Sequence, residues 1–158
     1  MPVYTVPINC STAITAAIDV FEIASGANRP ITLLGFEISQ TSEVGDTQEE
    51  QLEMLLRRVT GAPTSGSGGP SAATVRAIEA DESLATGVTF ENGNTTKLTG
   101  GTSEELMRFA WNVRVPYLYV PIPEARPGIL VSDHLVLEMV STPGDSITKI
   151  VGWVAWLE

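Results

Sequence analysis

The sequence has very little of the chemistry that cross-linked or metal-binding domains need. Among its 158 residues there is one cysteine, Cys10, and one histidine, His134. A single cysteine cannot form an internal disulfide, so the chain must fold by burying apolar surface, for which its length is sufficient. Zinc sites made of cysteine and histidine need several such ligands, so this class of site is excluded. We expect no metal and no cofactor.

Long apolar runs and basic residues are also scarce. No apolar segment approaches the roughly 20 residues of a membrane helix, and the start MPVYTVPINC lacks the basic region of a signal peptide. Nine basic against 19 acidic residues give a formal charge of −10. Such a chain repels phosphate backbones, so we expect neither nucleic acid nor membrane as a partner. The charge fits a soluble surface, and it also fits attraction to a basic partner.

The motifs of common enzymes are incomplete. The stretch SGSGG at 65–69 is followed by Pro70, which has no N–H, and by no lysine, whereas a phosphate-binding loop needs both groups. Ser132, Asp133 and His134 are consecutive, so a strand would point them to alternating faces and they cannot form a catalytic triad among themselves. We expect His134 to be an ordinary surface histidine and the protein not to be an enzyme.

One acidic turn leaves a cation site open as an alternative. Carboxylates gather there, and they are ligands that calcium prefers. The usual calcium-loop pattern D-x-[DN]-x-[DN]-G is absent, however, and the interpretation we favour is a solvated acidic turn. The residues concerned are Glu43, Asp46, Glu49 and Glu50.

A hydrophobic period of two runs through almost the whole chain, which is typical of β-strands. Leu135, Leu137 and Met139, for example, alternate with more polar neighbours. Turn-forming residues separate the strands, and Asn92-Gly93 predicts a tight hairpin turn. About eight to nine short antiparallel strands with little helix predict one all-β domain over 1–158, a sandwich or a barrel. The predicted strands are 4–8, 12–23, 31–39, 52–60, 74–79, 85–91, 106–113, 117–122, 134–139 and 147–157.

Two segments are predicted to lie at the margin of this domain. Residues 61–72 are rich in glycine, serine and proline. They do not link two domains, because the strands before them would form an incomplete sheet with open edges. We expect a flexible surface arm that is ordered only by a neighbour. Residues 1–9 are expected to form an N-terminal arm or an edge strand.

The last predicted strand is apolar on both faces. Ile147, Val151, Trp153 and Leu157 share one face, and the other face carries Ile150, Val154 and Trp156. Either the chain covers the second face itself or that face packs on another subunit, since exposed apolar patches are a liability for a monomer. We favour a contact between copies of the chain.

Two arginines, Arg57 and Arg58, interrupt an apolar strand, so one of them lies beside a buried face. A buried arginine needs a carboxylate or carbonyl partner. That partner belongs either to the same chain or to a neighbouring subunit, because arginine is enriched at interface centres. The hypothetical oligomer interface therefore comprises Arg57, Arg58, Ile150, Trp153, Val154 and Trp156.

Three stretches together resemble the small capsid decoration (cement) proteins encoded among the head genes of tailed bacteriophages and prophages. They are QTSEVGDTQEEQLEMLLRRVTG with SGSGG, within 40–69; NTTKLTGG, at 94–101; and VPIPEARPGILVSDHLVLEMVSTPGDSITKIVGWVAWLE, at 120–158. The resemblance covers about half of the chain and includes no catalytic signature.

The resemblance implies a jelly-roll fold and a homotrimer that stands on the outer capsid surface, binds the phage major capsid protein and stabilises the shell. The protein would be made in the bacterial cytoplasm and located in the virion. An alternative is a carbohydrate- or receptor-binding jelly-roll module of a phage tail or fibre, with Tyr117, Tyr119 and Trp153 as its aromatic platform. The residues expected to contact the capsid are Pro2, Val3, Tyr4, Ser65, Gly66, Ser67, Gly68 and Gly69.

Overall fold

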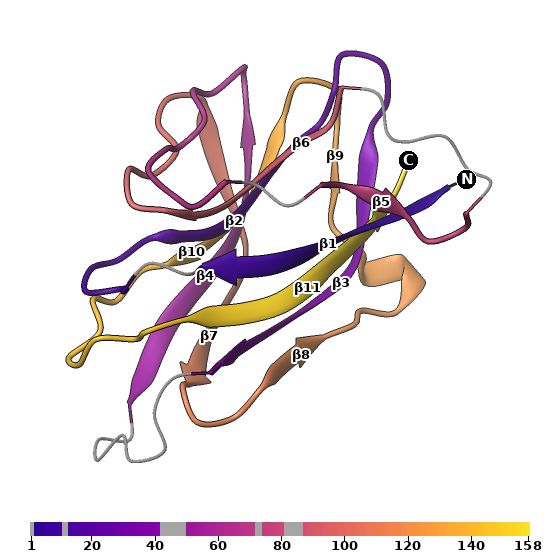
Figure 1. Cartoon of the computed structure of the whole chain (residues 1–158). Helices are drawn as coiled ribbons and strands as arrows, with labels where there is room; N and C mark the ends of the chain where they lie inside the picture. Colours follow the sequence, from indigo (N-terminus) through magenta and orange to yellow (C-terminus); the bar gives the residue numbers. More distant parts are fainter. Residues whose placement is uncertain (1, 11–12, 42–49, 72–73, 81–86) are drawn as a thin grey trace.

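The chain folds back on itself as one long antiparallel hairpin, which rolls up into two sheets packed face to face (Figure 1). The computed structural model describes residues 2–10, 13–41, 50–71, 74–80 and 87–158. Its elements are β1 (Val3–Cys10), β2 (Asp19–Ala24), β3 (Ile31–Gln40), β4 (Gln51–Thr60), β5 (Arg76–Ala77), β6 (Thr89–Asn94), β7 (Thr102–Asn112), β8 (Tyr117–Tyr119), the 3-10 turn η1 (Pro123–Ala125), β9 (Gly128–Ile129), β10 (His134–Met139) and β11 (Ile150–Leu157).

The strand pairing is that of a jelly roll. The first strand pairs with the last and each later pair nests inside it: β1 with β11, β2 with β10, β3 with β8 and β4 with β7. Pairings β11–β3 and β10–β4 then join these ribbons into two sheets, ordered β5-β1-β11-β3-β8 (with β9 also on β3) and β6-β2-β10-β4-β7. This arrangement confirms the expected jelly-roll-like β-sandwich.

The core lies between the two sheets and is built by alternate residues of each strand. On β10 the predicted inner face, Leu135, Leu137 and Met139, is buried. Trp156 of β11 is fully buried and packs on Tyr4, with ring centroids 6.2 Å apart. The first and last strands, β1 and β11, are therefore held together by backbone pairing and by an aromatic contact inside the core.

Several strand predictions are accurate and others are wrong in an informative way. The predicted segments 31–39 and 52–60 lie within one residue of β3 and β4. The prediction over 12–23 is too long, because the regular strand begins only at Asp19. Asn92 and Gly93 do not form a hairpin turn but lie within β6. Gly93 has a positive φ of 65° there, and a Cβ on it would lie 3.3 Å from the sulfur of Cys10.

The two tryptophans of β11 provide a test of the layer assignment. Trp156 fills the core, whereas Trp153 on the opposite face of the strand is only half-buried. We expect Trp156→Ala to lower the free energy of unfolding by about 3–5 kcal/mol, because it opens a large cavity. Urea denaturation of dilute protein measures this loss. Trp153→Ala is the matched control with a clearly smaller loss, and equal losses would contradict the assignment.

Candidate functional site

Both arginines of β4 find partners within their own chain. Arg57 Nε lies 2.9 Å from Glu138 Oε2 of β10, and the pair is nearly buried. Arg58 donates to the Glu104 carboxylate of β7 and, over 3.0 Å, to the carbonyl of Gly128. The internal ion pair, one of the two alternatives for these arginines, is therefore present at both positions.

Three other members of the hypothetical interface lie inside the domain. The side chains of Ile150, Val154 and Trp156 are fully buried between the sheets and leave no surface for another copy of the chain. Tyr4, expected to contact a capsid, is buried in the same core. The predicted contact role is therefore corrected for these four residues. Ile150, Val154 and Trp156 face the core because β11 is a central strand whose even-numbered residues point inward. Of the four predicted interface residues on β11, Trp153 alone lies on its outer face.

The glycine-rich segment is not a free arm over its described residues. Residues 61–71 lie beside residues 95–101, and four backbone hydrogen bonds of 2.9–3.1 Å join the two at Thr64–Thr99 and Ser67–Thr96. Together they cover the part of the outer face of the five-stranded sheet that lies over β2 and β10, and we call them the lid. Gly69 is required by space, since a Cβ there would lie 2.0 Å from the carbonyl oxygen of Asn92.

Three carboxylates of the sheet hold the lid. The amide of Leu98 donates to Asp19 Oδ2 over 2.7 Å, and the amide of Gly66 donates to Glu22 Oε2 over 2.9 Å. Lys97 Nζ donates to Glu138 Oε1 over 2.6 Å and to the carbonyl of Met139 over 3.2 Å. The carboxylates lie on β2 and β10, so the lid is fixed to the two strands that run beneath it.

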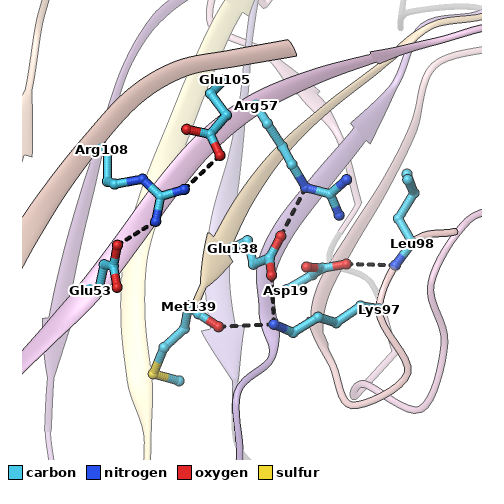
Figure 2. Close-up of polar contacts among 9 residues, drawn as sticks. All are labelled: Asp19, Glu53, Arg57, Lys97, Leu98, Glu105, Arg108, Glu138 and Met139. Atoms are coloured by element: carbon cyan, nitrogen blue, oxygen red, sulfur yellow. Dashed lines mark hydrogen bonds and ion pairs between the residues drawn. The ribbon is translucent and has the colours of Figure 1, made fainter. Parts of the chain in front are cut away.

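Glu138 is the centre of the polar group drawn in Figure 2. One oxygen of its carboxylate forms an ion pair with Arg57 and the other accepts a hydrogen bond from Lys97, while Asp19 accepts the Leu98 amide beside them. Farther along the sheet, Arg108 joins the carboxylates of Glu53 and Glu105, in a more exposed setting. A small apolar cluster of Val59, Leu98 and Val136 lies between the lid and the sheet.

His134 is buried, so the prediction of a surface histidine is wrong. Its Nδ1 lies 2.6 Å from Glu22 Oε1 on the neighbouring strand β2. Burial alone would raise the pKa of Glu22, but hydrogen bonds from His134, Gly66 and Ser65 outweigh it and lower the pKa. The carboxylate lies between the imidazole and the serine, whereas a catalytic triad requires the imidazole in the middle. The arrangement is that of an anchoring hydrogen bond between two side chains.

The outer face of the six-stranded sheet lacks such a cover among the described residues. Backbone register places Pro7 beside Trp153, Trp153 beside Glu37, and Glu37 beside Leu118, so these four form a row across β1, β11, β3 and β8. Their neighbours along each strand face the core, so the row faces outward. The indole N–H of Trp153 donates to Glu37 over 3.2 Å.

Exposed aliphatic side chains continue this row along one stretch of chain. Leu118 is 59% exposed, and Val120 and Ile122 are 62% and 67% exposed. Val120 lies against Gly35 of β3, beside the row. We call Pro7, Leu118, Val120, Ile122 and Trp153 the apolar face. The apolar face could not be predicted from composition, because its residues come from strands that are distant in the sequence and are brought together only by strand pairing.

The remaining predicted positions have varied surroundings. Pro2 and Val3 are half-buried at the start of β1, which is nearly an edge strand because only the two-residue β5 lies beyond it. Ser65, Ser67 and Gly68 are exposed on the outside of the lid. Burial raises the pKa of Cys10 to about 12, which keeps its thiol protonated near neutral pH.

The acidic turn lies mostly beyond the described chain. Glu43, Asp46 and Glu49 fall outside the described residues, and Glu50 accepts a hydrogen bond from the amide of Gly144. Within the described ranges, no group of three or more histidine, cysteine or acidic side chains is placed to hold a metal ion. The part of the chain that the structure describes has no helix long and apolar enough to span a membrane.

No protein-family model, curated protein or solved structure matches the chain. Its fold class therefore follows from the strand pairing alone.

Burial decides the strength of the arginine pairs, and two glutamates test this. Glu138→Gln removes the carboxylate that both Arg57 and Lys97 contact in a nearly buried place. We expect a loss of about 2–4 kcal/mol in the free energy of unfolding. Glu104→Gln removes the partner of the half-exposed Arg58 and is expected to cost less than about 1 kcal/mol. Chemical denaturation of both variants measures the difference, and a larger cost at Glu104 would refute the account.

Proposed function

We propose that the chain is a non-enzymatic structural protein, a head decoration (cement) protein of a tailed bacteriophage or prophage. It forms a homotrimer, binds the major capsid protein on the outer surface of the virion and stabilises the shell. The resemblance of 40–69, 94–101 and 120–158 to such proteins suggests this function. The observation that carries it is the apolar face, which a partner must cover.

The energetics of the apolar face support self-association. Each exposed Å² of apolar surface gains about 25 cal/mol when it leaves water. Leu118, Val120 and Ile122 are all more than half exposed, and they follow one another on alternate residues of the same extended stretch. Monomeric proteins rarely leave contiguous patches of this kind in water. Other copies of the chain carry the same apolar face, so symmetric contacts between copies can cover it on every subunit.

The edge of the sheet is built for side-chain contact and against strand addition. Pro121 and Pro123 follow β8 directly and have no N–H to donate to another strand. Strand addition is thereby disfavoured next to the prolines, while Ile122 between them and Leu118 and Val120 before them stay available for side-chain contact. A closed ring of copies fits these two properties.

The exposed side of the lid supplies a candidate contact with the shell. Ser65, Ser67 and Gly68 are exposed there. We assign them to the capsid contact, together with the half-buried Pro2 and Val3 at the start of β1. The acidic chain, with its formal charge of −10, is suited to a shell surface with basic groups.

The alternative of a sugar-binding module is less well supported. The ring of Tyr117 stacks on Phe109 with centroids 4.0 Å apart, and Tyr119 packs on Phe36 at 5.3 Å. A sugar platform needs a free aromatic face, and these rings use theirs within the domain. Trp153 is tied to Glu37 by its indole N–H.

Solution mass tests the trimer. We expect about 50 kDa by light scattering coupled to size exclusion, three times the 16.8 kDa chain. Leu118→Asp places a charge in the apolar face and is expected to give monomer. Leu106→Asp, at an exposed leucine on β7 of the other sheet, is the matched control and keeps the trimer.

A second assay tests the partner separately from the oligomer. Purified expanded phage heads, sedimented with the protein, are expected to retain the wild type and the Leu106→Asp variant and to release the Leu118→Asp monomer. A wild-type monomer, or a Leu118→Asp trimer, contradicts the assignment of the apolar face. A wild-type trimer that no head retains contradicts the decoration function alone.

A further inference from the structure

The lid is attached to the sheet at few points, and one of them is an ionisable group in an unusual setting. Asp19 of β2 is fully buried beneath the lid. One of its oxygens accepts the Leu98 amide over 2.7 Å, and the other has no hydrogen-bond partner among the described residues. A buried carboxylate with a free oxygen is poorly compensated for the loss of water when it carries charge.

The charged groups around Asp19 do not supply that compensation. Arg57 from β4 and Lys97 from the lid both face it, but both are bonded to Glu138 of β10, whose own charge opposes that of Asp19. Farther along β2 and β10, Glu22 and His134 satisfy each other. Arg57 and Lys97 thus face two carboxylates, and both make their direct contacts with Glu138 and not with Asp19.

Ionisation of Asp19 therefore favours an open lid. Burial is the main cause that raises the pKa of Asp19 from an ordinary 3.8 to about 6. A raised pKa means that the closed state prefers the protonated acid. The contribution of Asp19 to the stability of the closed lid is complete below pH 3.8 and is lost as the pH rises through 6. Opening the lid restores water to the carboxylate and removes the penalty.

We propose that the lid is a proton-operated latch: it is held closed while Asp19 carries a proton, and it opens more readily when Asp19 is ionised. Opening separates Leu98 from Val59 and Val136 and exposes the outer face of the five-stranded sheet, with its carboxylates. The small residues of 65–69 suit this movement, since the segment is held mainly by backbone hydrogen bonds. The latch stands independently of the proposed function.

Amide hydrogen exchange measured by NMR on the full chain tests the latch. The Leu98 amide reports on lid opening, and the Leu137 amide in central strand β10 reports on global unfolding. We expect Leu98 to be less protected than Leu137 at both pH 5 and pH 7.5. We also expect its protection factor to fall about tenfold between these two pH values, as the linkage relation gives for a pKa that moves between 3.8 and about 6. Equal protection of the two amides would mean that the lid does not open by itself and would overturn the proposal.

Two variants identify the titrating group. Asn at position 19 can still accept the Leu98 amide but cannot ionise, so Asp19→Asn is expected to abolish the pH dependence at Leu98. Persistence of the tenfold change in this variant would overturn the assignment to Asp19. His134 also lies beneath the lid, where it contacts Glu22. His134→Gln is expected to keep the tenfold change, and its loss there would move the latch from Asp19 to the histidine. The second variant decides the question even if Asp19→Asn does not fold.

Discussion

Strand β10 lies between β2 and β4 in the middle of the five-stranded sheet, with the core on one face and the lid on the other. Its inward residues are apolar, but its outward residues include His134 and Glu138, which must be satisfied without water. The structure meets this constraint from both sides. Glu22 on β2 partners the histidine, and Arg57 on β4 and Lys97 in the lid partner the glutamate. The position of the lid follows from these bonds.

The two outer faces of the sandwich have opposite characters. The five-stranded sheet presents charged and polar groups, and its own chain covers those on β2 and β10 with a glycine-rich segment that packs closely because its residues are small. The six-stranded sheet presents Pro7, Leu118 and Trp153, and the described chain leaves them uncovered. A protein that binds through apolar surface keeps that surface open and satisfies its polar groups internally. This division is the one that the proposed structural role requires.

The alternation of apolar residues predicted a large part of the fold, because it is a local property. It located β3 and β4 almost to the residue and identified the inner face of β10. Alternation says which residues point away from the core, but it does not say what lies above them. His134 was therefore placed at the surface, and the second apolar face of β11 was given to a neighbour although Ile150, Val154 and Trp156 form the core.

The lid and the apolar face depend on contacts between residues far apart in the chain. The composition of 61–72 showed a lack of bulk, and that property is shared by free arms and by segments packed tightly against a backbone. One signal was available for the buried pair: Glu22 lies within the apolar run VFEIA, where an acidic residue needs an internal partner. No comparable signal marks the row from Pro7 to Leu118, which exists only through strand register.

The account rests on one covered and one uncovered outer face, and oxidative footprinting by mass spectrometry compares them directly. We expect Leu118, Val120 and Trp153 to react in dilute monomer and to be protected at concentrations that give the trimer. Leu98 and Val136, beneath the lid, are expected to be protected in both conditions. Equal reactivity of Leu118 in monomer and trimer, or reactivity of Leu98 as high as that of Leu118 in the monomer, would contradict the account.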